Sequence, residues 1–193
     1  MDNIKDGYTR VSSIISLFSD FSHIDAGVLA NKAKIGTNVH KAINEHIELG
    51  ITLSQLNERE ELYFRSWKEW YENQDGRVCH METRLYDDAR MITGCIDGIW
   101  VNTGACLIDW KTSANENSLT WPLQAALYIE LIRLNKDLFD FPIFDTVFFL
   151  KLDRYGKKAS MCSYSLSPFH FEVANALVKL HSKKNEVAYS RAG

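Results

Sequence analysis

Two carboxylates and a lysine occur in two short apolar segments near the middle of the chain, which predict the strands of a β-hairpin. The segments are Met91–Val101 and Ala105–Lys111, and the three-residue turn between them ends at Gly104. A turn of this length usually needs a positive φ at its last position, which glycine tolerates. Pairing the residues on either side of the turn places Asp97 directly across from Asp109.

This opposition of Asp97 and Asp109 predicts a cation site. Opposed side chains in an antiparallel pair have Cβ atoms about 4.5–5.5 Å apart, and like charges at that distance repel. A divalent metal held by hard oxygen ligands is the simplest way to neutralise them. Lys111 follows Asp109 by two residues, so it projects from the same face of its strand. Strand geometry alone therefore gathers two carboxylates and one ammonium.

The elements around this hairpin predict a protein of the α/β (α+β) class, with a mixed central sheet flanked by helices. Helices are expected at Val11–Phe18, Ile35–Leu49 and Asn57–Glu72, from Thr120 to about Leu134, and at Phe169–Ser182. Further strands are expected at Arg77–Tyr86, Thr146–Leu152 and Ala159–Leu166. The order of helices, three strands, a helix, two strands and a helix favours a sheet with helices packed on it.

Composition and charge indicate an ordinary globular protein. The chain has 193 residues, of which 46% are hydrophobic and 24% charged, with a formal net charge of −3. That charge does not indicate a nucleic-acid binder, nor does it exclude one, and a solvated surface explains the basic clusters at Lys151–Lys158 and Lys179–Lys184. No apolar run approaches the ~18–20 residues of a membrane span. Since Met1–Asp6 is unlike a signal peptide, we expect a cytoplasmic protein without membrane contact.

Cysteine usage predicts neither a disulfide nor a zinc site. The four cysteines are Cys79, Cys95, Cys106 and Cys162. None forms a Cys-x-x-Cys pair, so zinc-site spacing is absent. In the hairpin register Cys95 lies opposite Lys111 and Cys106 opposite Trp100, which argues against a disulfide between these two cysteines. All four are interpreted as small buried residues in a reducing compartment.

Four short motifs follow one another along the chain. They are Gly36-x-x-x-His40, Gly94-x-x-Asp97, Asp109-Trp110-Lys111-Thr112 and Gln124-x-x-x-Tyr128. Gln124 and Tyr128 share one helix face because they are four residues apart. Each motif alone is weak, since a helical histidine is usually structural and a Gln/Tyr pair usually an ordinary hydrogen-bonding face. Asp-x-Lys by itself would mean little.

Together, in this order, the motifs resemble the PD-(D/E)XK nuclease superfamily, and more narrowly its RecB-like exonuclease branch. That branch includes the mitochondrial genome maintenance exonuclease and many phage exonucleases. The resemblance covers roughly residues 35–130. It implies one nuclease domain with a restriction-endonuclease-like core. Its expected parts are a mainly helical segment at 1–75, the catalytic core at 76–182 and a tail at 183–193.

The resemblance assigns a role to each matched position around the hairpin. It implies that Asp97 and Asp109 bind metal, with the Trp110 carbonyl as a third protein oxygen. Lys111 would orient or deprotonate the attacking water and offset charge on the phosphate. His40 would add a metal ligand. These roles suit phosphodiester hydrolysis, because a bound cation both makes a water nucleophilic and stabilises the charge of a pentavalent phosphate.

The remaining positions are expected to contact DNA or complete the metal site. Gln124 and Tyr128 would fix the catalytic strand and the DNA backbone, and Thr112 is a further candidate for DNA binding. Glu82 is a candidate ligand on the preceding strand, where it shares the alternation of His80 and Arg84.

The expected cofactor is Mg²⁺ or Mn²⁺, since an imidazole beside carboxylates favours Mn²⁺ without excluding Mg²⁺. Iron–sulfur members of the superfamily carry one cysteine before the core and three after it. Here three of the four cysteines fall at or before Cys106, so no iron–sulfur cluster is expected.

The resulting expectation is a metal-dependent DNA exonuclease that acts near strand ends in recombination, repair or degradation. Its substrate would be single-stranded DNA or the end of a duplex, and a second copy of the chain or a recombination or replication protein could be its partner. A compact chain of this kind would suit a phage-encoded enzyme in a bacterial host. The alternatives are a structure- or sequence-specific endonuclease, a non-catalytic DNA-binding or assembly subunit, and an unrelated metabolic α/β enzyme.

Overall fold

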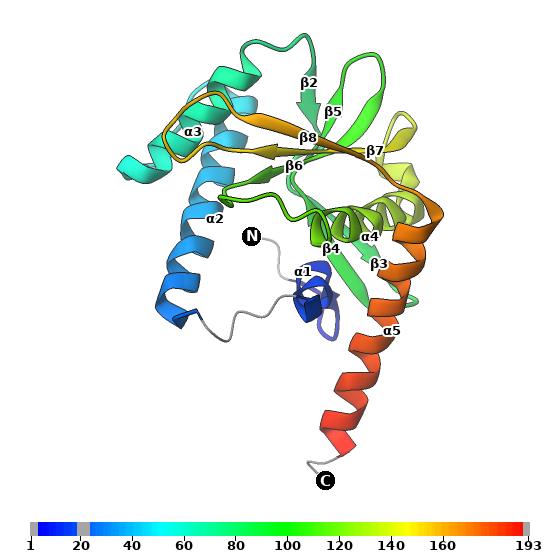
Figure 1. The fold of residues 1–193 in the computed structure, drawn as a ribbon. Helices are drawn as coiled ribbons and strands as arrows, with labels where there is room; N and C mark the ends of the chain where they lie inside the picture. Colours follow the sequence, from blue (N-terminus) through cyan, green and yellow to red (C-terminus); the bar gives the residue numbers. More distant parts are fainter. Residues whose placement is uncertain (1–3, 19–23, 191–193) are drawn as a thin grey trace.

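The strands form two sheets in the computed structural model, which describes residues 4–18 and 24–190 (Figure 1). The larger sheet has the order β2 (Arg77–Cys79), β5 (Gly98–Val101), β6 (Ala105–Lys111), β7 (Ile143–Lys151) and β8 (Ser160–Ser165). The smaller has the order β1 (Thr9–Arg10), β4 (Ile92–Ile96) and β3 (Thr83–Asp87). The β6–β7 and β1–β4 pairs are parallel and the other pairs antiparallel, so both sheets are mixed.

The helices confirm the mixed α/β class that the sequence predicts. They are α1 (Val11–Ile15), η1 (Ser16–Phe18), α2 (Ala26–Leu49), α3 (Glu58–Tyr71), α4 (Thr120–Leu134), η2 (Lys136–Leu138) and α5 (Pro168–Ser190). Helix α2 begins nine residues earlier than expected, at an Asp25 side chain that accepts from the Gly27 and Val28 N–H groups. Helix α5 continues to Ser190, beyond the expected end at residue 182. Within the described ranges, no helix has the length and apolarity needed to cross a membrane.

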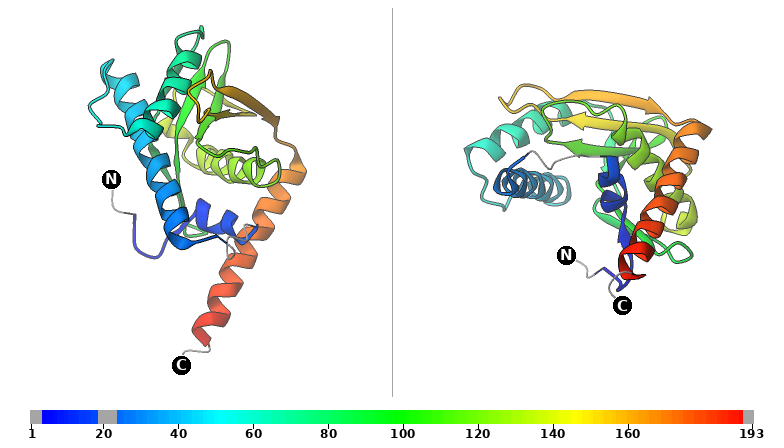
Figure 2. Two further views of the ribbon diagram at one scale, coloured as in Figure 1. Left: turned by 60° about the vertical axis from the view of Figure 1, so that its left-hand side comes forward. Right: turned by 60° about the horizontal axis from the view of Figure 1, so that its bottom comes forward.

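Strand β6 separates two apolar cores, because its side chains alternate between them. Leu107 belongs to a cluster with residues of α1, α4 and α5, whereas Ile108 and Trp110 belong to a cluster with residues of α2 and α3. Figure 2 shows α2 and α3 together on one side of the molecule, with α4 and α5 on the other. Six of the seven β6 residues are buried, so the strand is fixed from both faces.

The hairpin register is as predicted, but the first hairpin strand is interrupted. Val101 pairs with Ala105 and the ladder continues to Gly98 and Ile108. The chain leaves this ladder at Asp97, so Asp97 is not the ladder partner of Asp109 that the register predicted, and the preceding residues form β4 in the other sheet. The prediction of one strand over Met91–Val101 is therefore wrong.

The pairing predicted for Cys95 is also wrong, since Cys95 lies opposite Arg84 of β3 and not opposite Lys111. Cys106 does lie opposite Trp100, and all four cysteines carry free thiols.

The expected strand Arg77–Tyr86 is divided in the same way, into β2 and β3. His80 and Glu82, in the break, have φ angles of 50° and 47°, in the left-handed region that strands do not use. The two long strands thus break at neighbouring places, and a backbone hydrogen bond of 3.4 Å from the Glu82 N–H to the Asp97 carbonyl joins the two breaks.

Gly104 does not have the positive φ that we expected of it. Its lack of a side chain serves another purpose, because a Cβ there would lie 2.2 Å from the Phe144 ring. Strand β7 therefore packs directly against the turn. Just before α4, the Asn117 Oδ1 accepts hydrogen bonds from the Leu119 and Thr120 N–H groups.

Candidate active site

Strand β6 ends in an ion pair that α4 holds in place. Asp109 and Lys111 lie on one face of the strand, with 2.7 Å between Asp109 Oδ1 and Lys111 Nζ. The Lys111 ammonium donates a hydrogen bond of 2.9 Å to Gln124 Oε1, and Gln124 Nε2 in turn donates to the Tyr128 hydroxyl at 3.3 Å. The two α4 residues expected to share a face therefore do so, and that face meets the lysine.

Helix α2 brings His40 to the other side of the same strand ends. His40 Nδ1 lies 3.2 Å from Asp97 Oδ1, and His40 Nε2 lies 3.0 Å from the Trp110 carbonyl oxygen. The Trp110 N–H donates to the second oxygen of Asp97 at 2.8 Å. One imidazole thus joins the strand break at Asp97 to the backbone of β6, between Asp109 and Lys111.

Three side chains in this region could hold a metal ion. His40, Glu82 and Asp97 each offer one ligand atom, and these atoms lie within 4.8 Å of one another. An imidazole and two carboxylates suit Mn²⁺ and Mg²⁺. The Trp110 carbonyl, expected as a further ligand, lies against His40 Nε2, whereas His40 Nδ1 faces Asp97. The residues present therefore fit a divalent cation.

Asp109 does not belong to that group of three, because its Oδ1 faces the Lys111 ammonium. Glu82 reaches the group from the turn between β2 and β3 and not from a strand position, and it is the exposed member of the three. Thr112 lies beside α2, where a Cβ on Gly36 would be 3.5 Å from its hydroxyl oxygen.

Burial and close packing shift the acid–base behaviour of the site. Burial alone would lower the pKa of His40, but the Asp97 and Asp109 carboxylates outweigh it and raise that pKa to about 9. Burial likewise opposes ionisation of Asp97, yet His40 and Lys111 outweigh it and lower the Asp97 pKa. For Asp109, burial raises the pKa to about 6, with the Asp97 charge adding to the effect and Lys111 opposing it. The two carboxylates therefore differ in proton affinity.

The glycine of the second motif makes room for the tyrosine of the fourth. A Cβ on Gly94 would lie 2.6 Å from Tyr128 Cε1, so the ring packs on the bare backbone of β4. Burial and the nearby carboxylates Asp109 and Asp97 raise the pKa of the Tyr128 hydroxyl, which keeps it neutral. Two motifs that are distant in the sequence thus form a single packing unit.

Two aromatic rings beside Lys111 were not predicted as part of the site. The Lys111 Nζ lies 6.0 Å from the centre of the Trp121 ring and 5.4 Å from that of Phe149, and the two rings stack on each other. Trp121 precedes Gln124 by three residues on α4, which is a usable signal of a shared face. Phe149 has no such signal, because it comes beside Asp109 only through the parallel pairing of β6 with β7.

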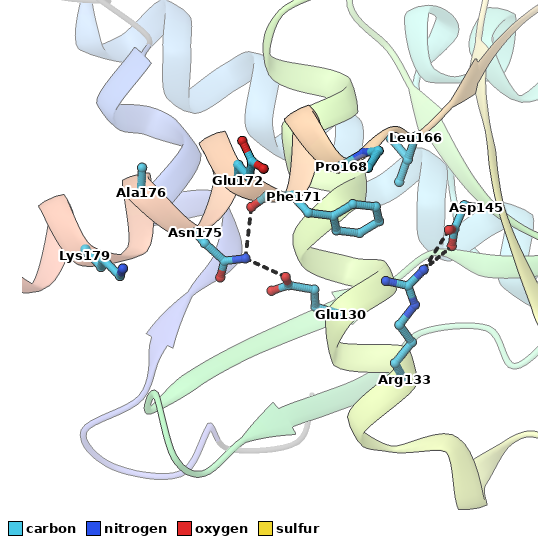
Figure 3. Close-up of a pocket in the computed structure, with 10 residues that line it drawn as sticks. All are labelled: Glu130, Arg133, Asp145, Leu166, Pro168, Phe171, Glu172, Asn175, Ala176 and Lys179. Carbon is cyan, nitrogen blue, oxygen red and sulfur yellow. Dashed lines mark hydrogen bonds and ion pairs between the residues drawn. The ribbon is translucent and has the colours of Figure 1, made fainter.

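A pocket lies away from these residues, between α4, α5 and β7. It has a volume of about 710 Å³, and Figure 3 shows that some of its polar side chains contact one another. Arg133 is paired with Asp145, and Asn175 donates to Glu130. None of the motif residues lines this pocket.

The comparison with protein families agrees with the arrangement of the site. A family model described as the PD-(D/E)XK nuclease superfamily matches residues 38–186, well over half of the chain, and the chain belongs to this superfamily. Membership implies a nuclease, a hydrolase that acts on nucleic acid, and members generally use divalent metals.

Among curated proteins, no sequence matches this chain significantly. Among solved structures, one that is similar is titled "Crystal structure of SSO0001". It has a TM-score of 0.45 and 11% sequence identity, and the alignment covers 93% of this chain and 79% of that one.

Proposed function

We propose that this chain is a metal-dependent DNA exonuclease that hydrolyses phosphodiester bonds near strand ends. The observation that supports the proposal is the meeting of all four sequence motifs in one place. His40, Asp97, Lys111 and Gln124 come from α2, the β4–β5 break, β6 and α4, and hydrogen bonds and ion pairs connect them into two adjoining groups. The restriction to strand ends follows from the resemblance to the RecB-like branch.

In this proposal the metal site and the lysine both act on the reacting phosphate. A divalent cation held by His40, Asp97 and Glu82, with Asp109 and the Trp110 carbonyl nearby, would supply the positive charge that activates a water and stabilises the transition state. Mg²⁺ and Mn²⁺ both suit these donors.

Lys111 is the group that would touch the reacting atoms from the protein side. Its ammonium is held between a carboxylate oxygen of Asp109 and the amide oxygen of Gln124. Its remaining N–H can therefore donate a hydrogen bond to a phosphate oxygen or to the attacking water. Since its side chain is only 18% exposed and lies beside two aromatic rings, its charge is less screened there than in water.

The proposal includes the whole chain as one nuclease domain, with a helical part at 1–75, the catalytic core at 76–182 and the remainder at 183–193. DNA is the proposed substrate, and recombination, repair or degradation inside the cell the proposed setting. Gln124, Tyr128 and Thr112 would help to fix the catalytic strand and the DNA backbone.

Cleavage of labelled DNA tests this function. Linear single-stranded, linear double-stranded and closed circular DNA are incubated with Mg²⁺, Mn²⁺ or EDTA. We expect metal-dependent loss of linear DNA only, abolished in Asp109→Ala and Lys111→Ala and retained in Lys136→Ala, which removes an exposed lysine elsewhere. Cutting of the closed circle would replace the exonuclease with an endonuclease on the same core. If the wild type cleaved no DNA with either metal, the proposed nuclease activity would be refuted, and a binding or assembly subunit would be favoured.

A further inference from the structure

The connection between β7 and β8 carries an unusual concentration of positive charge. Lys151, Arg154, Lys157 and Lys158 line one pocket of about 540 Å³. Asn115, from the loop that follows β6, lines the same pocket. We call it the hairpin pocket. In a chain with a formal net charge of −3, four cations around one pocket require an explanation.

The hairpin pocket adjoins the catalytic end of β6. Lys111 pairs with Lys151 in the parallel register of β6 and β7, and the Leu152 N–H donates a hydrogen bond of 2.8 Å to the Lys111 carbonyl. From Lys111 the chain reaches the pocket wall within four residues, at Asn115. A strand of nucleic acid that leaves the active site on this side would therefore meet the pocket next.

Helix α3 holds the backbone of the β7–β8 connection. The buried Ser66 accepts the Asp153 N–H at its side-chain oxygen (2.8 Å) and the Ala159 N–H at its carbonyl (3.1 Å). The turn between them uses Gly156, whose φ is 73°. Arg65 of α3 packs against that glycine, since a Cβ there would lie 2.3 Å from its guanidinium. The cations are thus displayed on a fixed support.

Most of this positive charge has no counter-ion in the part of the chain that the structure describes. Among the residues that the structure describes, Arg154, Lys157 and Lys158 form no ion pair, whereas Lys5, Lys68 and Arg133 each do. The one carboxylate in the connection, Asp153, accepts the Tyr155 and Lys157 N–H groups. Both bonds go to its Oδ1, which holds the turn together, and Asp153 forms no ion pair with the described lysines.

An exposed aromatic ring accompanies these cations. Tyr155 also lines the hairpin pocket and is 61% exposed, and the Arg154 guanidinium lies 4.7 Å from the centre of its ring. Cations that follow a phosphate backbone, combined with an aromatic ring on which a base can stack, are the usual means of binding a single strand. Inside a paired duplex the bases stack on one another and offer no free face to such a ring.

We propose that the hairpin pocket is a second substrate-binding site, which holds the internal phosphodiester backbone of a single-stranded segment while Tyr155 stacks on an unpaired base. This inference rests on the proposed function, since it takes DNA as the substrate. It extends that function by placing a strand contact on the β7–β8 connection and by assigning the strand as unpaired there.

Binding in EDTA tests the pocket without cleavage. A fluorescein-labelled single-stranded 20-mer is titrated with wild type, with Lys157→Gln/Lys158→Gln and with the matched control Lys136→Gln/Lys184→Gln. The control also removes two exposed lysines, at positions outside the pocket. Since each contact with a single-strand phosphate contributes about 0.7 to the slope of log K against log salt, the pocket variant should lower that slope by about 1.4 and the control should not. Equal slopes in the two variants would overturn the proposal.

The stacking is tested with Tyr155→Ala against Phe169→Ala, which removes another exposed ring (65%). We expect a loss of affinity of about five- to a hundredfold for the single strand with Tyr155→Ala alone, and little change for a blunt duplex. A similar loss on the duplex would overturn the assignment of an unpaired strand. A loss in the lysine variant that requires a terminal phosphate on the oligonucleotide would overturn binding to the internal backbone.

The two proposals fail in different measurements. If the wild type cleaves no DNA with Mg²⁺ or Mn²⁺, the proposed function is refuted, while the EDTA titrations still decide whether the pocket binds a strand. If the wild type cleaves and the two lysine variants show the same KM for a long oligonucleotide, the pocket is refuted and the nuclease stands.

Discussion

The amide of Gln124 holds the ammonium of Lys111, with 2.9 Å between Oε1 and Nζ. The lysine is therefore positioned by a helix as well as by its own strand. Tyr128 extends this support, since its hydroxyl accepts from the other end of the same amide. Because the Lys111 side chain has several rotatable bonds, such a contact decides where its charge lies relative to a reacting phosphate.

Gln124→Ala should lower kcat by about ten- to a hundredfold with a smaller change in KM, because it frees the ammonium from its position without removing the charge. Tyr128→Phe should have a milder effect, of about fivefold or less, since the bond that it removes is a weak one of 3.3 Å. Steady-state kinetics on linear DNA at saturating metal measures both effects.

Leu134→Ala is the control for these substitutions, because it truncates an exposed side chain (60%) of the same helix. Thermal unfolding should be nearly unchanged in Gln124→Ala. If its kcat were normal, or if it lost activity only in proportion to lost folded protein, Gln124 would have no positioning role.

Gly94→Ala should destabilise the protein by roughly 1–3 kcal/mol, because the added Cβ would lie 2.6 Å from the Tyr128 ring and force it away from β4. Gly36→Ala is the matched substitution at the other motif glycine. Its Cβ would make an ordinary 3.5 Å contact with Thr112, so it should stabilise α2 by up to ~1 kcal/mol. Urea unfolding of both variants measures the difference, and equal effects would contradict this reading of the two glycines.

The parts of the site that the sequence predicted are those that local geometry determines. A three-residue turn fixes the register of its two strands, and the pairing of Val101 with Ala105 follows from it. The shared face of Gln124 and Tyr128 follows from helical periodicity in the same way. Both relationships depend on residues within ten positions of one another.

The parts that the sequence did not predict depend on tertiary contacts. The break at Asp97 is stabilised by the Trp110 N–H and by His40 from α2, and neither contact has a periodic signal. Phe149 reaches Lys111 only because β7 returns to pair in parallel with β6 after α4. Side-chain alternation indicates which residues share a face of a strand but not which strand lies beside it.

Arg90→Leu should lower the free energy of unfolding by roughly 2–4 kcal/mol, since it leaves the carboxylates of Asp87 and Glu130 without their cation. Arg90 forms ion pairs with both, and its Nη1 also donates to Asn175 Oδ1 at 2.5 Å. This network joins the β3–β4 turn to α4 and α5. Chemical denaturation monitored by tryptophan fluorescence measures the loss.

Arg133→Leu is the comparison for that variant, because Arg133 and its partner Asp145 form an ion pair that is about half exposed, at 53% and 43% (Figure 3). Exposed pairs contribute ~1 kcal/mol or less. If Arg133→Leu lowered the free energy of unfolding as much as Arg90→Leu does, burial would not be what makes the Arg90 ion pairs stabilising.

The proton on His40 should make the stability of the metal-free protein fall, and its affinity for metal rise, as the pH increases. Protonated, its ring donates to Asp97 and to the Trp110 carbonyl at once, and its pKa is raised from 6.5 to about 9. Because the folded-state pKa is the higher one, this stabilisation is complete below pH 6.5 and is lost as the pH rises through 9. A divalent cation at the same ring must displace that proton, so metal affinity should rise by up to about tenfold per pH unit over the same range.

Calorimetric titration with Mn²⁺ at pH 6.5, 7.5 and 8.5, beside thermal unfolding of the metal-free protein, measures both effects. His40→Gln is the control, because its amide can still hydrogen-bond but does not titrate. We expect the variant to bind Mn²⁺ more weakly, with a flatter dependence on pH, and its metal-free form to lose less stability between pH 6.5 and 9 than the wild type does. If wild type and His40→Gln show the same pH dependence in both measurements, the proton on His40 is not what the metal displaces, and the ligand role belongs to the carboxylates alone.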